Sequence, residues 1–393
     1  MDAYTPLVAR VLKIQDITQG ALKSNYLVRY RGTLTLEAAQ AYDQLAADLK
    51  PLDITPLFRN ENGQAEVLLM PGTINPTPSN PWVNMLMFAL TLFSVLYAGA
   101  LSARAATGEE SLLEYFLLPL SNLQAGIPFA ASLLAILLAH EFGHYLAARY
   151  HKTRVTLPYF IPLPISPLGT MGAFIRLKEP PKNKRILLDI GVAGPLAGLV
   201  VAIPVLLYGL SISTISHINV PPGGGIQLEG NSILYLLSKY AVFGQLLPAP
   251  ISYDGLPPLL YWVRYFFTGQ PLPLGGLDVM ISPVAWAGWA GLLVTALNLI
   301  PAGQLDGGHL LYVLVGKRAR ILWPFILGAL FLLGFAWSGW WLWAVLILVL
   351  GRIYAEPLDQ ITTLNAGRKA IAIAGLVIFL LVFTPVPLIQ FLA

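Results

Sequence analysis

Stretches of apolar residues alternate with short polar segments from residue 82 to the end of the chain, whereas residues 1–75 are mixed in polarity. Several apolar stretches approach or exceed the ~18 residues that cross a bilayer as a helix. We therefore expect a mainly α, polytopic membrane helix bundle over residues 82–393. The pattern predicts about seven transmembrane helices, at 82–103, 126–148, 186–210, 282–300, 320–336, 339–353 and 370–391.

The N-terminal residues 1–75 predict a small soluble α+β domain. Two strand-like segments are followed by a segment with apolar residues at helical spacing, for which Thr35 is a candidate N-cap. Two more strand-like segments predict a hairpin at 54–70. Residues 76–81, rich in Pro, Asn and Ser, form the expected linker to the membrane domain. This domain is a candidate for binding a cytoplasmic partner.

Basic residues indicate the orientation of the bundle. Seven Lys and Arg residues lie in the segment 151–185 and three more at 317–320, whereas the long segment 211–281 has few. Because Lys and Arg are enriched in cytoplasmic loops, we expect the two basic segments in the cytoplasm and 211–281 as an outer loop. Alternation of the spans then places residues 1–81 in the cytoplasm and the C-terminus outside.

The composition limits the class of protein and the kinds of metal ligand that the chain can offer. The chain is 56% hydrophobic and 11% charged, against roughly 25% charged residues in soluble domains. It has no cysteine, so a metal site must use His, Asp or Glu. Nothing resembles a nucleic-acid-binding surface. The first residues fit neither a signal peptide nor a transit peptide, which favours a bacterial protein or a mature form without its targeting segment.

The second predicted span ends in ionisable residues, although a charge at the centre of a bilayer costs at least ~2.5 kcal/mol. His140 and His144 are four residues apart, so ~400° of helical rotation puts both imidazoles on one face, where they can share a metal ion. Glu141 lies ~100° from His140, where it can take a proton from a water held by that metal. The pattern H-E-x-x-H is typical of zincins, in which zinc lowers the pKa of the water toward ~7.

A catalytic zinc site needs a third protein ligand and one open position. Asp306 is a candidate, because it follows the fourth predicted span and the topology brings it to the same shallow cytoplasmic depth as His144. Pro301 and the glycines around Asp306 predict broken helix, which membrane proteins tolerate where it lines a polar cavity. Asp is also a favoured N-cap, so a capping role for a helix that begins near Gly307 stays open.

At these residues the sequence resembles the site-2 protease family of intramembrane zinc metalloproteases (peptidase M50-like). HEFGH at 140–144 and NLIPAGQLDGG at 298–308 are similar to its two motifs, the second being Asn-x-x-Pro-x-x-x-x-Asp-Gly. The resemblance covers 126–318 and includes GVAGPLAG at 191–198, a small-residue face suited to close helix packing. The N-terminal domain, the outer loop and the QLDGG wording resemble the plastid and cyanobacterial EGY-like subgroup, whose Gly-Asn-Leu-Phe motif reads Gly-Asn-Ser-Ile at 230–233.

The resemblance implies an enzyme and a role for each site residue. His140, His144 and Asp306 would hold one Zn²⁺ ion, Glu141 would be the general base, and Asn298 would bind substrate or stabilise the oxyanion. The implied reaction is cleavage of transmembrane segments of membrane proteins within the lipid bilayer, near its cytoplasmic side. The implied location is the plasma or thylakoid membrane of a bacterium, specifically a cyanobacterium.

Two other functions stay open. A membrane metal-binding transporter could use the same ligands, although a transport path needs polar groups through the full depth and the ionisable residues gather at one side. An inactive protease-like scaffold is the third hypothesis, but it would have no chemical need for Glu141. Asn298 could instead be an interhelical hydrogen-bonding group without a chemical task.

Two single residues and one loop segment lead to further predictions. His309, one turn after Asp306, is expected to support the site rather than to bind the metal. Asp189 is expected to pair with Lys184 and Arg185 at the start of the third span. The segment 166–181 has strand-like and turn-like character, so it could offer an edge to which an unwound substrate adds as a strand.

Overall fold

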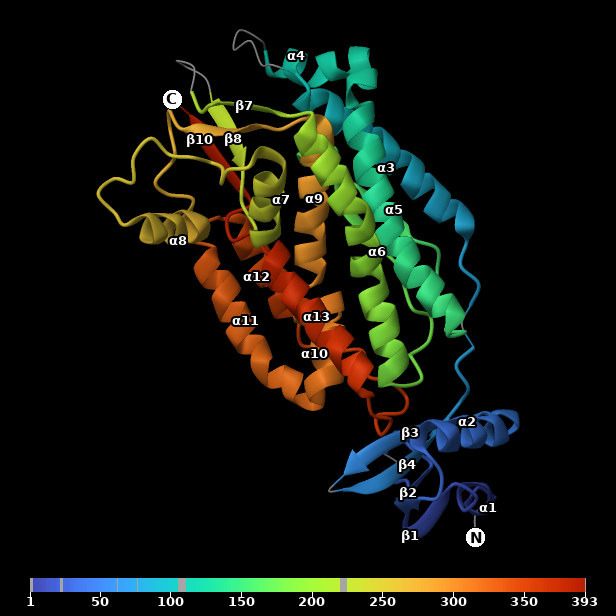
Figure 1. Cartoon of the computed structure of the whole chain (residues 1–393). Helices are drawn as coiled ribbons and strands as arrows, with labels where there is room; N and C mark the ends of the chain where they lie inside the picture. The colour runs from blue at the N-terminus through green and yellow to red at the C-terminus, as the bar shows by residue number, and fades with distance from the viewer. Residues whose placement is uncertain are drawn as a thin grey trace.

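The computed structural model describes residues 3–21, 24–61, 63–75, 77–104, 111–219 and 225–392; Asn62 of the predicted hairpin and Pro76 of the predicted linker lie outside these ranges. Figure 1 shows a helical bundle in the middle of the molecule, a small α+β unit at one end, and short helices and strands at the other end. The described chain is mainly helical, and its strands form small antiparallel sheets.

The N-terminal unit is an antiparallel sheet with a helix packed against it. Its strand order is β1-β2-β4-β3. Alternate strand residues point into one core, where Tyr30, Phe58 and Val67 are fully buried together with Leu45 of helix α2. The elements are α1 (Thr5–Val8), β1 (Leu12–Gln19), β2 (Val28–Leu34), α2 (Ala38–Leu49), η1 (Lys50–Leu52), β3 (Ile54–Glu61) and β4 (Gln64–Pro71).

The predicted N-cap of α2 was wrong. The helix begins after Glu37, whose side chain makes no capping bond. Thr35 is instead held by the turn before β1, because its N–H donates to the carbonyl of Val11 (3.0 Å) and its hydroxyl to the carbonyl of Arg10 (3.3 Å). These contacts engage the hydroxyl that would otherwise be available for capping.

Three apolar segments are long enough to cross a bilayer, judged by length and composition: α3 (Pro81–Ser102), the continuous run Leu113–Tyr150, and α6 (Lys184–Ser211). The run contains α4 (Leu112–Leu117), the 3₁₀ helix η2 (Leu118–Gly126) and α5 (Ile127–Tyr150). Shorter helices complete the bundle (Figure 1). They are α9 (Pro283–Asn298), α10 (Asp306–Val315), α11 (Ala319–Leu333), α12 (Gly339–Leu350) and α13 (Ala366–Val382), with the 3₁₀ turn η3 (Gly316–Arg318) between α10 and α11.

Helices α5, α6 and α9 form the centre of the bundle. Small residues bring the backbones together: a Cβ added at Gly288 of α9 would lie 2.6 Å from Cα of Leu206 in α6. A Cβ at Gly291 would lie 2.9 Å from the side chain of Ile136 in α5. The apolar cluster around these contacts fixes the depth and rotation of α5, which carries HEFGH.

The last predicted span, 370–391, was wrong in its final part. Helix α13 ends at Val382, and the chain continues through Pro385 and Pro387 into β10 (Leu388–Leu392). Proline has no backbone N–H to continue a helix. Strand β10 instead pairs with β8 (Gly225–Glu229) of the expected outer loop.

The segment 230–233 joins the short elements of residues 211–281 to the bundle. The N–H of Gly230 donates to the carbonyl of Pro387 (2.7 Å), and the indole of Trp289 in α9 donates to the carbonyl of Gly230 (2.8 Å). Ser232 then caps helix α7 through the N–H of Tyr235. This motif therefore has a structural role far from HEFGH. The other elements between α6 and α9 are β7 (Thr214–His217), α7 (Ile233–Phe243), α8 (Pro258–Thr268) and β9 (Leu277–Met280).

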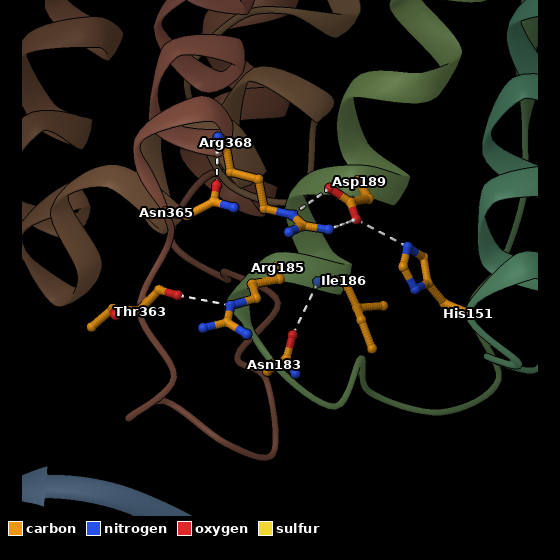
Figure 2. Close-up of polar contacts among 8 residues, drawn as sticks. All are labelled: His151, Asn183, Arg185, Ile186, Asp189, Thr363, Asn365 and Arg368. Carbon is orange, nitrogen blue, oxygen red and sulfur yellow. Dashed lines mark hydrogen bonds and ion pairs between the residues drawn. The ribbon is translucent and has the colours of Figure 1, made fainter. Parts of the chain in front are cut away.

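At the opposite end, Asp189 joins three helices (Figure 2). Its carboxylate accepts two hydrogen bonds from the guanidinium of Arg368 at the start of α13 (3.0 and 2.8 Å). Nε2 of His151, at the end of α5, lies 3.0 Å from the same carboxylate. The predicted pairing of Asp189 with Lys184 and Arg185 was wrong, because Asp189 faces α13 and α5 whereas Arg185 points into the neighbouring loop.

The N-terminal unit docks onto this end of the bundle. The N–H of Phe58 in β3 donates to the carbonyl of Leu358 (2.9 Å), and the N–H of Gln360 donates to the carbonyl of Phe58 (3.0 Å), so the segment 357–360 adds to the edge of the sheet. Asp359 in turn donates its N–H to the carbonyl of Lys182, just before α6 (2.7 Å). One short segment thus connects the N-terminal sheet, α6 and α13.

Candidate active site

The HEFGH residues lie in the last turns of α5, and the side chains of His140, Glu141 and His144 are buried. The four-residue spacing places the two imidazoles on one face, edge to face, with their ring centroids 4.9 Å apart and their Nε2 atoms 3.2 Å apart. Two ring nitrogens therefore point to the same place, as the helical spacing predicts.

Asp306 is the first residue of α10, and a break in the helices brings it to the imidazoles. Between α9 and α10 the backbone turns through Gly303, whose φ of +58° is in the left-handed region that glycine adopts without strain. Oδ2 of Asp306 lies 3.4 Å from Nε2 of His140 and 3.3 Å from Nε2 of His144. The N-cap of α10 is Leu305, so the alternative in which Asp306 caps this helix was wrong.

The donor set of His140, His144 and Asp306 fits a tetrahedral divalent metal. The three mutual distances are 3.2, 3.3 and 3.4 Å. Ligands about 2.0–2.1 Å from a tetrahedral zinc ion lie about 3.3 Å from one another, and nitrogen and carboxylate oxygen are ligands that zinc accepts. Three protein ligands leave a fourth position open, as catalytic zinc sites require.

Groups behind the ligands fix their orientation. Nδ1 of His144 lies 2.7 Å from the carbonyl of Ile190 in α6, so Nδ1 carries the proton and Nε2 is free to bind a metal. Gly194 of α6 lies against the imidazole of His144, where a Cβ would overlap the ring. A Cβ at Gly198 would lie 3.2 Å from Cβ and Nδ1 of His140. The small-residue segment of α6 therefore shapes the wall behind both imidazoles.

Glu141 borders a cavity of about 170 Å³ that the three ligand residues also line. The backbone N–H of Ile175 lies near its carboxylate. The carboxylate oxygen Oε2 is buried and has no hydrogen-bond partner among the described residues. This oxygen is available to accept a proton inside the cavity.

Asn298 and His309 line the same cavity. Asn298 is the last residue of α9, and its Nδ2 lies 3.3 Å from Nε2 of His140. His309 packs against Gly191 of α6, and its Nδ1 is buried without a hydrogen-bond partner in the described part of the chain. All five residues singled out from the sequence motifs, including Asn298 and Asp306, thus face one space.

One wall of the cavity comes from a hairpin between α5 and α6. Strand β6 (Thr170–Phe174) pairs with β5 (Tyr159–Pro162) on one side, and residues 173–175 border the cavity. Within the described chain, this sheet has only these two strands. The sequence showed the strand-like character of 166–181, but gave no sign that Ile175 contacts Glu141, because a backbone N–H carries no sequence signal.

Comparison with known proteins places this site in a family. Residues 128–336 match the model of Peptidase family M50, and this range contains HEFGH, the hairpin and Asp306. No solved structure matches the chain.

Curated plant proteins are similar over most of the chain. "Probable zinc metalloprotease EGY1, chloroplastic" is 31% identical in Oryza sativa subsp. japonica, over 80% of this chain and 52% of the relative. The Arabidopsis thaliana protein of the same name is 29% identical, over 81% of this chain and 56% of the relative. "Probable zinc metalloprotease EGY2, chloroplastic" of Oryza sativa subsp. indica is 28% identical, over 92% of this chain and 62% of the relative.

The chain therefore spans between half and two thirds of the length of these relatives. The family match covers more than half of the chain and includes every residue of the site. The chain belongs to peptidase family M50, the site-2 protease family, and to its EGY-like subgroup.

Proposed function

We propose that this chain is a zinc-dependent intramembrane endopeptidase that cleaves transmembrane segments of membrane proteins. The observation that carries the proposal is the meeting of His140, His144 and Asp306 at tetrahedral ligand spacing, beside a buried carboxylate and within apolar helices. The relatives named as zinc metalloproteases support zinc as the ion.

In this proposal His140, His144 and Asp306 would hold the metal, which would supply Lewis acidity and lower the pKa of a water. Oε2 of Glu141 takes a proton from the attacking water and later gives it to the leaving amine. Nδ2 of Asn298, at the edge of the cavity, donates a hydrogen bond to the oxygen that becomes negative during attack.

Substrate binding is proposed at strand β6. A helical substrate hides its peptide bonds in internal hydrogen bonds, so it must unwind before attack. Because β5 pairs with only one edge of β6, the other edge can accept an extended segment by strand addition. Residues 173–175 would then hold the scissile bond next to Glu141 and the metal ligands.

The proposed topology keeps seven spans, from α3, α5, α6, α9, α11, α12 and α13, with the site near the cytoplasmic side. The docking of the N-terminal unit at the end with the basic segments supports a cytoplasmic domain over residues 1–75. Pairing of β10 with β8 supports placing the C-terminus on the side of the loop 211–281. The chloroplast proteins among the relatives support a thylakoid-type membrane; the bacterial source stays a prediction.

A transporter is disfavoured by what surrounds α5. The turns before His140 pack in an apolar cluster with α6 and α9 that includes Leu133, Leu137 and Trp289, and α5 has no ionisable group between its start and His140. An inactive scaffold is disfavoured because Glu141 is retained with one oxygen free in the cavity.

The test is Glu141→Gln in the full chain, with a transmembrane substrate co-expressed. We expect the variant to bind zinc as wild type does and to lose cleavage by at least about 10²-fold, the usual contribution of a general base. The matched variant His144→Ala should lose both zinc and cleavage. Cleavage by Glu141→Gln at the wild-type rate would overturn the mechanism.

A further inference from the structure

A second cavity, of about 230 Å³, lies between the N-terminal unit and the bundle. One wall is formed by the N-terminal unit around η1, β3 and the residues after β4. The other is formed by residues 151–154, which follow α5, and by 179–182, which precede α6. It is separate from the metal site, which is lined by other residues.

Cations converge on this cavity. Lys50 comes from the N-terminal unit, Lys152 and Arg154 from the segment after α5, and Lys182 from the segment before α6. Within the described residues, the side chains of Lys50, Lys152 and Arg154 have no hydrogen-bond or ion-pair partner. Lys182 pairs with Asp43, but both side chains are more than half exposed (52% and 60%), and such pairs contribute little.

The one carboxylate in the lining is already engaged. Glu179 accepts a hydrogen bond from the backbone N–H of Arg154 (2.7 Å). This bond helps to fix a turn in which Lys152 adopts a left-handed conformation, with φ of +56°. The turn places Lys152 and Arg154 on the wall opposite Lys50. Four exposed cations from three chain segments thus line one open cavity with a single carboxylate.

We propose that this cavity binds a compact phosphate-bearing anion. A phosphate group carries up to two charges and several acceptor oxygens, which suits lysine and arginine donors that approach from different directions. The volume is smaller than the ~300 Å³ at which sites for drug-sized ligands begin. Ile54, Ile74 and Leu358 add an apolar wall for the body of the ligand.

Two sources supply this chemistry. The cavity begins directly after α5 ends at Tyr150, so it lies at the level where an anionic lipid headgroup would sit. A soluble phosphate compound could enter from the same side. In either case the anion joins Lys50 of the N-terminal unit to the end of the helix that carries His140 and His144.

The test uses the full chain in nanodiscs and two probes. Inorganic pyrophosphate is titrated calorimetrically onto the chain in phosphatidylcholine discs, and retained phosphatidylglycerol is counted by native mass spectrometry from mixed discs. We expect saturable binding of one ligand per chain by at least one probe. Binding of pyrophosphate alone assigns a soluble ligand, binding of phosphatidylglycerol alone assigns a lipid, and binding of neither overturns the proposal.

Variants show whether the cavity is the binding site. Lys152→Asn with Arg154→Gln should weaken binding at least about tenfold, since two charge-assisted bonds are lost; asparagine tolerates the left-handed turn. The matched control is Lys317→Gln with Arg318→Gln, two exposed cations at the same end of the bundle. Equal weakening by both pairs would mean general charge attraction and would overturn the proposal.

Lys50→Gln tests the other wall independently if the double variant unfolds. It should also weaken binding, and hydrogen exchange should slow on ligand addition in both 50–56 and 151–154. Protection of only one of these segments would contradict a ligand that bridges them. None of these measurements depends on peptide hydrolysis, so their outcome is separate from that of the proposed peptidase.

Discussion

Gly194 of α6 lies so close to the imidazole of His144 that a Cβ on the glycine would occupy the space of the ring. The same imidazole is held from its other nitrogen by the carbonyl of Ile190, one turn earlier on α6. Helix α6 thus positions a metal ligand that belongs to α5. The small-residue motif shapes the site as well as the packing of the helices.

Gly194→Ala should weaken zinc binding, because the added methyl group pushes His144 away from His140 and Asp306. We expect a loss of about 10–100-fold in zinc affinity, as for other changes behind a metal ligand. The measurement is zinc titration of the purified chain with a competing chelator.

Substitutions of two other glycines provide a comparison for the zinc affinity of Gly194→Ala. Gly198→Ala should have a smaller effect, because its Cβ would meet His140 at 3.2 Å, a distance that a small shift relieves. Gly328→Ala in α11 has no atom within 4 Å of its Cβ; it should leave zinc binding unchanged and stabilise the helix by about 0.5–1 kcal/mol. Equal affinities for all three variants would refute the role of Gly194.

Removal of the metal should stop cleavage without unfolding the bundle. Helices α5 and α10 are held by apolar clusters that do not include the metal ligands. Treatment with a chelator should therefore lower the free energy of unfolding only by the contribution of zinc binding. This contribution is about 2.7 kcal/mol when free zinc is 100-fold above its dissociation constant. Thermal unfolding and a cleavage assay, each before and after zinc is restored, check this. Loss of the helical circular dichroism signal at room temperature would contradict it.

Asp189→Asn should destabilise the end of the bundle that faces the N-terminal unit. The substitution removes the charge that holds Arg368 by two hydrogen bonds and approaches His151 at 3.0 Å. The site is partly buried, so we expect a loss of about 1–2 kcal/mol in the free energy of unfolding. The measurement is chemical unfolding in detergent micelles.

Asp43→Asn is the control for that prediction, because its ion pair with Lys182 is well exposed. It should change the free energy of unfolding by less than about 0.5 kcal/mol. An equally small effect of Asp189→Asn would show that its network does not contribute to stability.

Asp359→Ala should release the N-terminal unit. The carboxylate of Asp359 is fully buried and accepts hydrogen bonds from the N–H groups of Ile361 (2.8 Å) and Thr362 (3.1 Å) and from the hydroxyl of Thr362. Leaving buried donors unpaired costs about 1–3 kcal/mol, which corresponds to roughly 5–150-fold more frequent opening. Protease cleavage of the linker 76–81 should become faster by a similar factor.

The matched control for this release is Asp48→Ala, which removes a carboxylate paired with Arg10 inside the N-terminal unit. Cleavage of the linker should stay at the wild-type rate in this variant. Equal rates for Asp48→Ala and Asp359→Ala would mean that Asp359 does not hold the unit in place.

The sequence predicts those parts of the site that depend on the type and spacing of side chains. The spacing of His140 and His144 predicts a shared ligand position through helix geometry, and the basic loops predict that Asp306 reaches the same end of the bundle. The structure brings these three residues within ligand distance of one another. Their roles as zinc ligands, and that of Glu141 as base, stay predictions until measured.

Other features of the fold could not be predicted from the sequence, for physical reasons. The partner of Asp189 is Arg368, 179 residues away, and local charge patterns favour nearer residues such as Arg185. The end of α13 was misplaced because TPVP at 384–387 is apolar enough to extend a hydropathy window, although its prolines end the helix. The docking of Phe58 with 357–360 depends on backbone groups that every residue has.

The backbone of Ile175 lies near the carboxylate of Glu141, at the wall of the cavity that holds the metal ligands. Oε2 of that carboxylate has no hydrogen-bond partner among the described residues, so it is free to accept a proton. In the proposed mechanism, an incoming peptide lies along residues 173–175, beside Glu141. A substrate whose N–H groups are still bonded within a helix cannot pair with that edge, so unwinding would be a condition for entry before it is one for hydrolysis.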